Sequence, residues 1–207
     1  MATEACDYKL QADIAPDCDN PQVQGLMNVA YLVNFDDIDR DNIVKSSDNP
    51  HIVQTLPLKA GKRAYKCIVP GKTPYTGTQS EFAAGTYRNK YNKTAVIVVL
   101  DSGPDVSRDV IDPIANGKFV FIFENKYQGK NKKNTFEIYG LEQGLSQTEG
   151  SQPKYSDDYD GGWTITLQEA NAPTSGIFLF DTDINKTRAA LESLVAGNTP
   201  KGTVTNS

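Results

Sequence analysis

The chain has 207 residues, a net charge of −5 and a hydrophobic content of 38%, which is enough for a folded domain with its own core. The acidic balance excludes a protein whose main work is to grip nucleic acid through its phosphates. Three cysteines (Cys6, Cys18 and Cys67) without a Cys-x-x-Cys pair predict reduced thiols, not disulfides or a zinc site. The sequence contains no signal-peptide pattern and no apolar run of membrane-spanning length, so we expect a protein made and kept in a cytoplasm, with no membrane partner.

The first half of the chain predicts a polar arm followed by strands. Residues 1–24 are polar and contain Pro16 and Pro21, which indicates an extended N-terminal arm. Apolar runs predict strands over 26–35, 51–58 and 63–69, the last with Tyr65, Cys67 and Val69 on one face. The most apolar run, KTAVIVVL at 93–100, predicts a central strand.

Residues 70–92 form a long excursion with few aliphatic side chains. Four aromatic residues lie in it: Tyr75, Phe82, Tyr87 and Tyr91. Long loops in compact domains are usually functional, and aromatic residues are enriched at interfaces. We therefore expect these four residues to form an interface, with a simple hairpin excursion as the alternative.

Two helices are predicted. Residues 104–116 place Val106, Val110, Ile111 and Ile114 at helical spacing, with Ser102 or Asp105 as the candidate cap. Residues 183–195 carry an apolar stripe, begin at the candidate cap Asp183 and end just before Gly197. The tail at 198–207 is expected to be exposed.

The stretch from Lys118 to Leu167 predicts an antiparallel meander with one buried face. Two strand-like runs, KFVFIFENKY and TFEIYGLEQGL, flank a basic turn, and DGGWTITLQEA follows a polar loop. Gly140 and Gly144 are expected to be backbone bends. The fold class is therefore α+β and mainly β: an antiparallel β-sandwich or barrel over 25–197, with one or two helices and the arm.

The sequence offers no convincing catalytic, cofactor or metal site. The one histidine, His51, has no nucleophile pattern near it, and no phosphate-binding glycine loop is present. Asp37, Asp39, Asp41 and Asp48 have the spacing of part of a calcium loop, but Asn42 stands where such loops need glycine. We expect a solvated acidic turn there, and no enzyme, cofactor or bound metal.

Two charged segments suggest contacts between copies of the chain. The basic turn carries Lys130, Lys132 and Lys133, and the acidic segment carries Asp37, Asp39 and Asp41. The plain interpretation is two solvated turns. The sharper hypothesis is that the lysines of one subunit face the acids of its neighbour, a head-to-tail contact that can close a ring.

One resemblance to a known family rests on TFEIYGLEQGL, the polar loop and DGGWTITLQEA, together with the strand GIFLF at 176–180. Over these residues the chain resembles tail-tube-type structural proteins of bacteriophages. The leader EACDYKLQADIAPDCDNP is also similar to virion proteins of phages that infect Bacteroidales. Tail-barrel ring proteins of crAss-like phages are a close alternative within this class.

The resemblance implies a structural virion protein without catalytic residues. Its subunits would form a homo-oligomeric ring, hexameric or dodecameric, and the rings would stack into a conduit for DNA. Its partners would be copies of itself, neighbouring tail or connector proteins, and passing DNA that it does not bind specifically. The alternative is a carbohydrate-binding or adhesin-like sandwich that uses Trp163 and tyrosines, although Trp163 is more typical of a core anchor.

Overall fold

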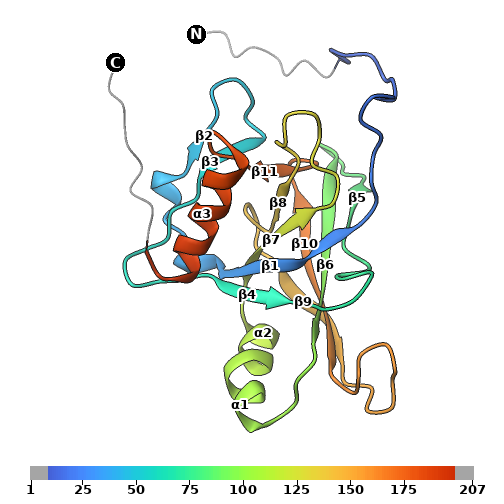
Figure 1. The fold of residues 1–207 in the computed structure, drawn as a ribbon, viewed down its shortest axis with the longest axis vertical. Coiled ribbons are helices and arrows are strands. Elements are labelled where there is room, and N and C mark those ends of the chain that lie inside the picture. Colours follow the sequence, from blue (N-terminus) through green and yellow to red (C-terminus); the bar gives the residue numbers. More distant parts are fainter. Residues whose placement is uncertain (1–8, 199–207) are drawn as a thin grey trace.

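The computed structural model describes residues 9–198 and has two β-sheets packed face to face (Figure 1). The predicted class, mainly β with two helices, is confirmed. The sheets do not close into a barrel, so the sandwich alternative holds. The predicted C-terminal tail lies almost entirely outside the described residues.

The larger sheet has seven strands in the order β2-β3-β11-β8-β7-β1-β4. Its pairings are antiparallel except for β3 with β11, which run parallel. The bounds are β1 (Leu26–Asn34), β2 (Val44–Lys45), β3 (Ile52–Thr55), β4 (Tyr65–Ile68), β7 (Phe119–Asn125), β8 (Phe136–Tyr139) and β11 (Ile177–Leu179). Two 3₁₀ turns, η1 (Phe35–Asp37) and η2 (Arg40–Asn42), follow β1.

The smaller sheet has four antiparallel strands in the order β5-β6-β10-β9. They are β5 (Gln79–Ala83), β6 (Lys90–Val99), β9 (Ser146–Ser151) and β10 (Trp163–Ala172). β5 lies inside the predicted excursion at 70–92, and β6 begins there at Lys90, three residues before the predicted strand. The segment therefore contains a β-hairpin and is not a loop without strands, while the interface formed by its aromatic residues stays a prediction.

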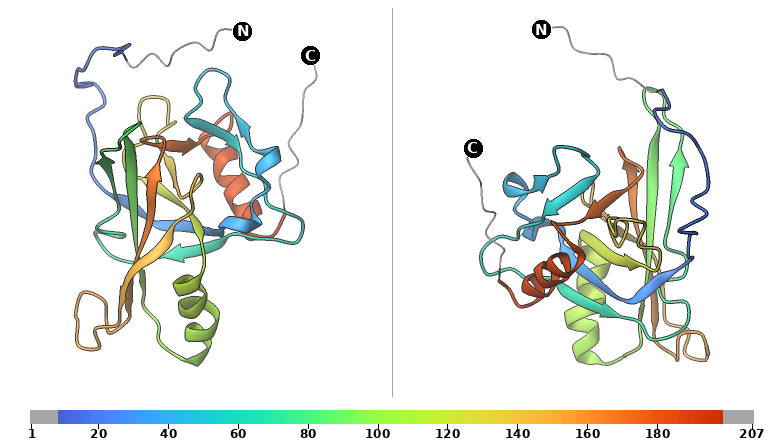
Figure 2. Two further views of the ribbon diagram at one scale, coloured as in Figure 1. Left: turned by 180° about the vertical axis from the view of Figure 1, so that it is seen from behind. Right: turned by 45° about the horizontal axis from the view of Figure 1, so that its top comes forward.

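The larger sheet is buried on both faces. Along β7, Phe119, Phe121 and Phe123 point into the core between the sheets. Val120 and Ile122 point into a second core beneath helix α3 (Ile184–Val195). Successive side chains of a strand alternate between faces, so an unbroken apolar run fits a strand covered on both sides. The molecule therefore has three layers, with α3 outermost (Figure 2).

Helix α3 matches its prediction. The Asp183 carboxylate accepts hydrogen bonds from the backbone N–H groups of Asn185 and Lys186, at 2.8 and 2.9 Å. Such a cap satisfies amides that the first turn leaves without partners. Gly197 has φ +77° just past the end, a conformation that favours glycine.

The other helical segment runs through α1 (Pro104–Val106), a π-turn (Ser107–Ile111) and α2 (Asp112–Asn116). Its extent is as predicted, and Ile111 and Ile114 are buried. The predicted caps are wrong, because Gly103 is the cap residue and no side chain accepts a bond there. The π-turn leads directly into α2, whose second residue is Pro113, which has no N–H to donate.

The predicted meander at 118–167 is divided between the two sheets. In the run at 135–145, Phe136–Tyr139 form β8 in the larger sheet and residues 140–145 form the crossover; β9 follows the run and pairs with β10 in the smaller sheet. The chain changes sheets at Gly140 (φ +83°) and Gly144 (φ +81°), which are the expected bends. Moreover β7 is buried on both faces, not on one.

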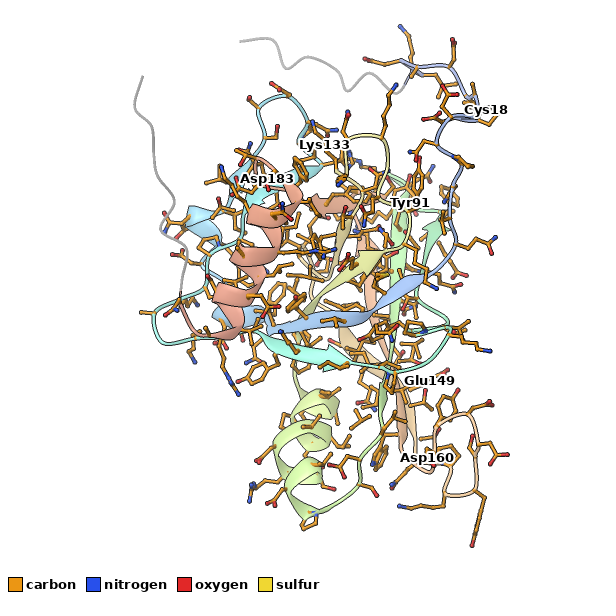
Figure 3. The ribbon with its side chains drawn as sticks, in the orientation of Figure 1. Cys18, Tyr91, Lys133, Glu149, Asp160 and Asp183 are labelled. Atoms are coloured by element: carbon orange, nitrogen blue, oxygen red, sulfur yellow. The ribbon has the colours of Figure 1, made fainter. Side chains whose placement is uncertain are left out.

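The long axis of the molecule has two distinct ends. The β5–β6 and β7–β8 turns lie at one end, together with the exposed arm segment at 9–24. Helical segment 104–116 and the 152–162 loop lie at the other end (Figures 1 and 2). The side-chain view places Lys133 near the first end and Asp160 at the second (Figure 3).

Candidate functional site

The aromatic residues predicted to form an interface separate into two groups. Tyr75 is only 2% exposed, and its ring packs edge-on against Phe121 with centroids 5.5 Å apart. Its hydroxyl lies 2.7 Å from the Cys67 carbonyl oxygen, to which it donates. The prediction that Tyr75 belongs to an interface is therefore wrong, because a buried anchor cannot meet a partner.

The other three aromatic residues surround the turn of the β5–β6 hairpin. Phe82 is 64% exposed and Tyr87 is fully exposed, while Tyr91 is partly buried. With Arg88 they line a hollow of about 470 Å³, whose other lining residues are Gly85, Asn89 and Pro173. We call this region (residues 82–91 with Pro173) the aromatic tip.

The three predicted lysines lie on the exposed turn between β7 and β8. Lys130, Lys132 and Lys133 are all exposed, and Lys132 adopts φ +57°. The turn is held by backbone bonds, including Lys132 N–H to the Gly129 carbonyl at 3.1 Å. The lysines therefore stand at the same end of the molecule as the aromatic tip (Figure 3).

The acidic segment is partly occupied by contacts within its own chain. Asp37 lies 3.2 Å from the Lys62 ammonium and accepts a 2.8 Å bond from the Asn34 amide. Asp39 accepts a 2.8 Å bond from Asn42. Asp41 is exposed, and among residues 9–198 no three His, Cys, Asp or Glu side chains are placed to hold a metal ion.

A buried ion pair lies inside the smaller sheet. Lys93 on β6 and Glu169 on β10 are paired in register and are each 1% exposed, with 3.9 Å between Nζ and Oε2. The Glu169 carboxylate also accepts backbone N–H bonds from Gly140, Glu142 and Gln143 at 2.8, 3.2 and 2.8 Å. It thus fastens the crossover between β8 and β9 to the smaller sheet.

The sequence contained a signal for this pair. Lys93 precedes Ala95 and Ile97 at intervals of two, and Glu169 follows Leu167 in the same way, so both charges fall on the buried face of a strand. Buried charges of this kind need partners. The contacts of Glu169 are to one lysine and three backbone amides of its own chain, which is typical of a structural pair.

Glu137 is one of the residues that line a hollow of about 760 Å³. The hollow is bounded by the base of the arm (residues 22–26), the 72–78 loop and the β7–β8 turn. Burial raises the pKa of Glu137 above its ordinary value, while a bond from Asn125 and the charge of Lys93 lower it by less.

His51 and Trp163, which the sequence analysis considered as catalytic and sugar-binding residues, both make contacts that stabilise the fold. The His51 ring Nδ1 lies 2.6 Å from the Gly176 carbonyl oxygen and donates to it, joining the loop before β3 to the loop before β11. Trp163 begins β10 and packs, partly buried, against the core between the sheets. Both residues connect parts of the fold.

The arm exposes large apolar side chains. Leu10 is 82% exposed, Ile14 is 90% exposed and Val23 is 52% exposed. The base of the arm is held by Lys126 N–H, which donates to the Gly25 carbonyl at 3.0 Å, while residues 9–24 join neither sheet. The described part of the arm thus carries apolar surface away from the body.

No protein-family model, curated protein or solved structure matches this chain. Among the described residues, no helix is long and apolar enough to cross a membrane.

Proposed function

We propose that the protein is a structural subunit that assembles with copies of itself into a ring, as the resemblance to phage tail proteins implies. One observation carries this proposal: several large apolar side chains are exposed on segments that protrude from the body. They are Leu10, Ile14 and Val23 on the arm, Phe82 and Tyr87 at the aromatic tip, and Tyr155 on the 152–162 loop. Apolar groups on protruding segments are typical of surfaces that a partner covers.

The edges of the sheets supply a second kind of contact surface. β4 ends the larger sheet with Tyr65 and Ile68 exposed at 45% and 63%, and β5 ends the smaller sheet with mostly exposed residues. Edge strands have unpaired N–H and C=O groups that a neighbouring chain can bind. Pairing of these edges between neighbours would supply the wall of the ring.

The proposal extends to the setting that the resemblance implies. The rings would form part of a phage tail tube or tail barrel, made in the bacterial cytoplasm and kept in the virion. The −5 charge would let DNA pass without binding, and the protein would act without catalysis or a cofactor. The carbohydrate-binding alternative stays a prediction, but the partly buried Trp163 gives it no exposed platform at that residue.

Negative-stain images of the purified full chain test the proposal. We expect closed rings of uniform diameter, and antibodies against the chain should label the tails of virions that contain it. Fields of particles of monomer size at every protein concentration, with unlabelled tails, would overturn the proposal.

A further inference from the structure

The turns and loops at the two ends of the long axis carry opposite charge: the β5–β6 and β7–β8 turns are basic, and the 152–162 loop is acidic. The turns at one end contain Arg88 and Lys90, and then Lys126, Lys130, Lys132 and Lys133, with no acid between 83 and 90 or between 126 and 133. The 152–162 loop at the other end contains Asp157, Asp158 and Asp160 against the single base Lys154. The adjoining helical segment adds Asp105, Asp109 and Asp112 against Arg108.

Each end also presents an aromatic group. Tyr155 is fully exposed on the acidic loop, two residues before Asp157. At the basic end, Phe82, Tyr87 and Tyr91 line the 470 Å³ hollow together with Arg88. One end thus carries a fully exposed tyrosine on the same loop as three aspartates, and the other end carries an aromatic hollow that Arg88 also lines.

We propose that the aromatic tip binds the 152–162 loop of a second copy of this chain. Tyr155 of that copy enters the hollow against Phe82 and Tyr87, and its Asp157 and Asp158 face Arg88 and Lys90. Aromatic side chains at the centre with charges at the rim form the usual arrangement of a protein interface. Opposite charges also fix the register and exclude the reversed orientation, because like charges would then meet.

The contact between the aromatic tip and the 152–162 loop would join copies of the chain end to end. The two surfaces differ and lie at opposite ends, so the contact is heterologous and leaves a free tip and a free loop on every pair. Copies can therefore add without limit along the long axis. This inference rests on the proposed ring function and gives it a direction: the contact joins one ring to the next, whereas the sheet edges join subunits within a ring.

The arm of a second copy is the competing occupant of the hollow. It carries Leu10 and Ile14 with Asp13 and Asp17, a similar combination of apolar and acidic groups. The loop is favoured because its three aspartates lie within four residues of one another beside a fully exposed tyrosine. Substitutions in the 152–162 loop should abolish binding if the loop is the occupant, whereas substitutions of Leu10 and Ile14 should abolish it if the arm is.

Charge reversal in the full chain tests the inference. One variant, Arg88→Glu/Lys90→Glu, makes the aromatic tip acidic, like the 152–162 loop, and the other, Asp157→Lys/Asp158→Lys, makes the 152–162 loop basic, like the aromatic tip. The control, Lys118→Glu/Lys186→Glu, reverses two exposed lysines outside both surfaces. Circular dichroism and thermal unfolding establish that each variant is folded, and electron microscopy with sedimentation at low salt counts single rings and stacks.

We expect each end variant alone to form rings but to lose stacks by roughly tenfold or more. Mixing the two variants should restore stacks, because the acidic tip of one then meets the basic loop of the other. The control should stack like the wild type, and added salt should disperse all stacks.

Three other results would overturn the inference while leaving the ring intact: wild-type rings that never stack, stacks unaffected by both end variants, or stacks lost on Leu10→Ser/Ile14→Ser but not on loop reversal. The last result would identify the arm as the occupant. A wild-type chain that forms no ring contradicts the proposed function itself, so the two failures are distinguishable.

Discussion

Glu169 and Lys93 face each other on β10 and β6, and the two residues differ in how many partners they have. Glu169 accepts three backbone N–H bonds in addition to its 3.9 Å contact with Lys93. The Lys93 ammonium lies near Glu169 and 5.6 Å from the centre of the Tyr139 ring. Removal of the acid therefore leaves more buried groups unsatisfied than removal of the base.

Glu169→Leu should lower the free energy of unfolding by roughly 3–5 kcal/mol, since it leaves a buried ammonium and three amides without their acceptor. Lys93→Met should be clearly less destabilising, because the carboxylate keeps its three amides. Urea unfolding of both variants checks the order. Equal losses, or a larger loss for Lys93→Met, would contradict the assignment of Glu169 as the fastener of the crossover.

Gly140→Ala should destabilise the fold more than Gly61→Ala. Both glycines have positive φ, +83° and +74°, so both variants carry a backbone strain of about 1–2 kcal/mol. At Gly140 a Cβ would also lie 2.4 Å from the Phe119 carbonyl oxygen, whereas at Gly61 nothing lies within 4 Å. We expect a further loss of about 1–3 kcal/mol at Gly140, measured as the difference between the two unfolding free energies.

Glu137→Gln should remove a pH dependence of stability. Burial raises the folded pKa of Glu137 above the unfolded one, so the folded state holds the proton more tightly. Its stabilising effect is present below the unfolded pKa and is lost as the pH rises through the folded pKa. The wild type should therefore lose stability relative to Glu137→Gln as the pH rises from the unfolded pKa to the higher folded pKa of Glu137, by about 1.4 kcal/mol per pH unit in that window.

Denaturant unfolding at several pH values measures this difference. The exposed Glu149→Gln is the matched control, because it removes the same charge at the surface. If the stabilities of the wild type and Glu137→Gln changed in parallel with pH, burial would not raise the pKa of the Glu137 carboxyl.

Tyr75→Phe should lower stability without changing assembly. It removes the hydroxyl that donates to the Cys67 carbonyl, a loss of about 0.5–1.5 kcal/mol. Tyr155→Phe removes an exposed hydroxyl and should leave the melting temperature unchanged. Calorimetry of the two variants compares their melting temperatures. A Tyr75→Phe variant with an unchanged melting temperature but altered oligomers would show that Tyr75 belongs to an interface.

The elements with strong local signals were predictable from the sequence. β1, β6, β10 and α3 occur close to where periodicity and capping placed them, because their core faces are mostly apolar and Asp183 caps α3. β9 was missed because its sequence, SQTEGS, has no apolar residue. It is an edge strand whose residues are partly or fully exposed, so burial left no pattern in it.

Long-range partners were harder to predict. The crossover at 140–145, which leads from β8 in the larger sheet to β9 in the smaller sheet, is held by Glu169 contacts with Gly140 and Gln143, and no local pattern contains these contacts. Tyr75 lies in the same polar, aromatic-containing segment as the exposed Phe82 and Tyr87, and the sequence does not distinguish it from them. Its burial follows from the tertiary fold, which packs its ring against Phe121. In contrast, the exposed positions of Phe82, Tyr87 and the three turn lysines agree with the sequence analysis.

Assembly of the chain with itself is the central claim, and sedimentation of the full chain across a wide concentration range tests it most directly. At a salt concentration that disperses stacks of rings, we predict a closed oligomer whose mass is a fixed multiple of 22.7 kDa, in exchange with free subunits at low protein concentration. A single species of 22.7 kDa at every concentration and salt would contradict the claim.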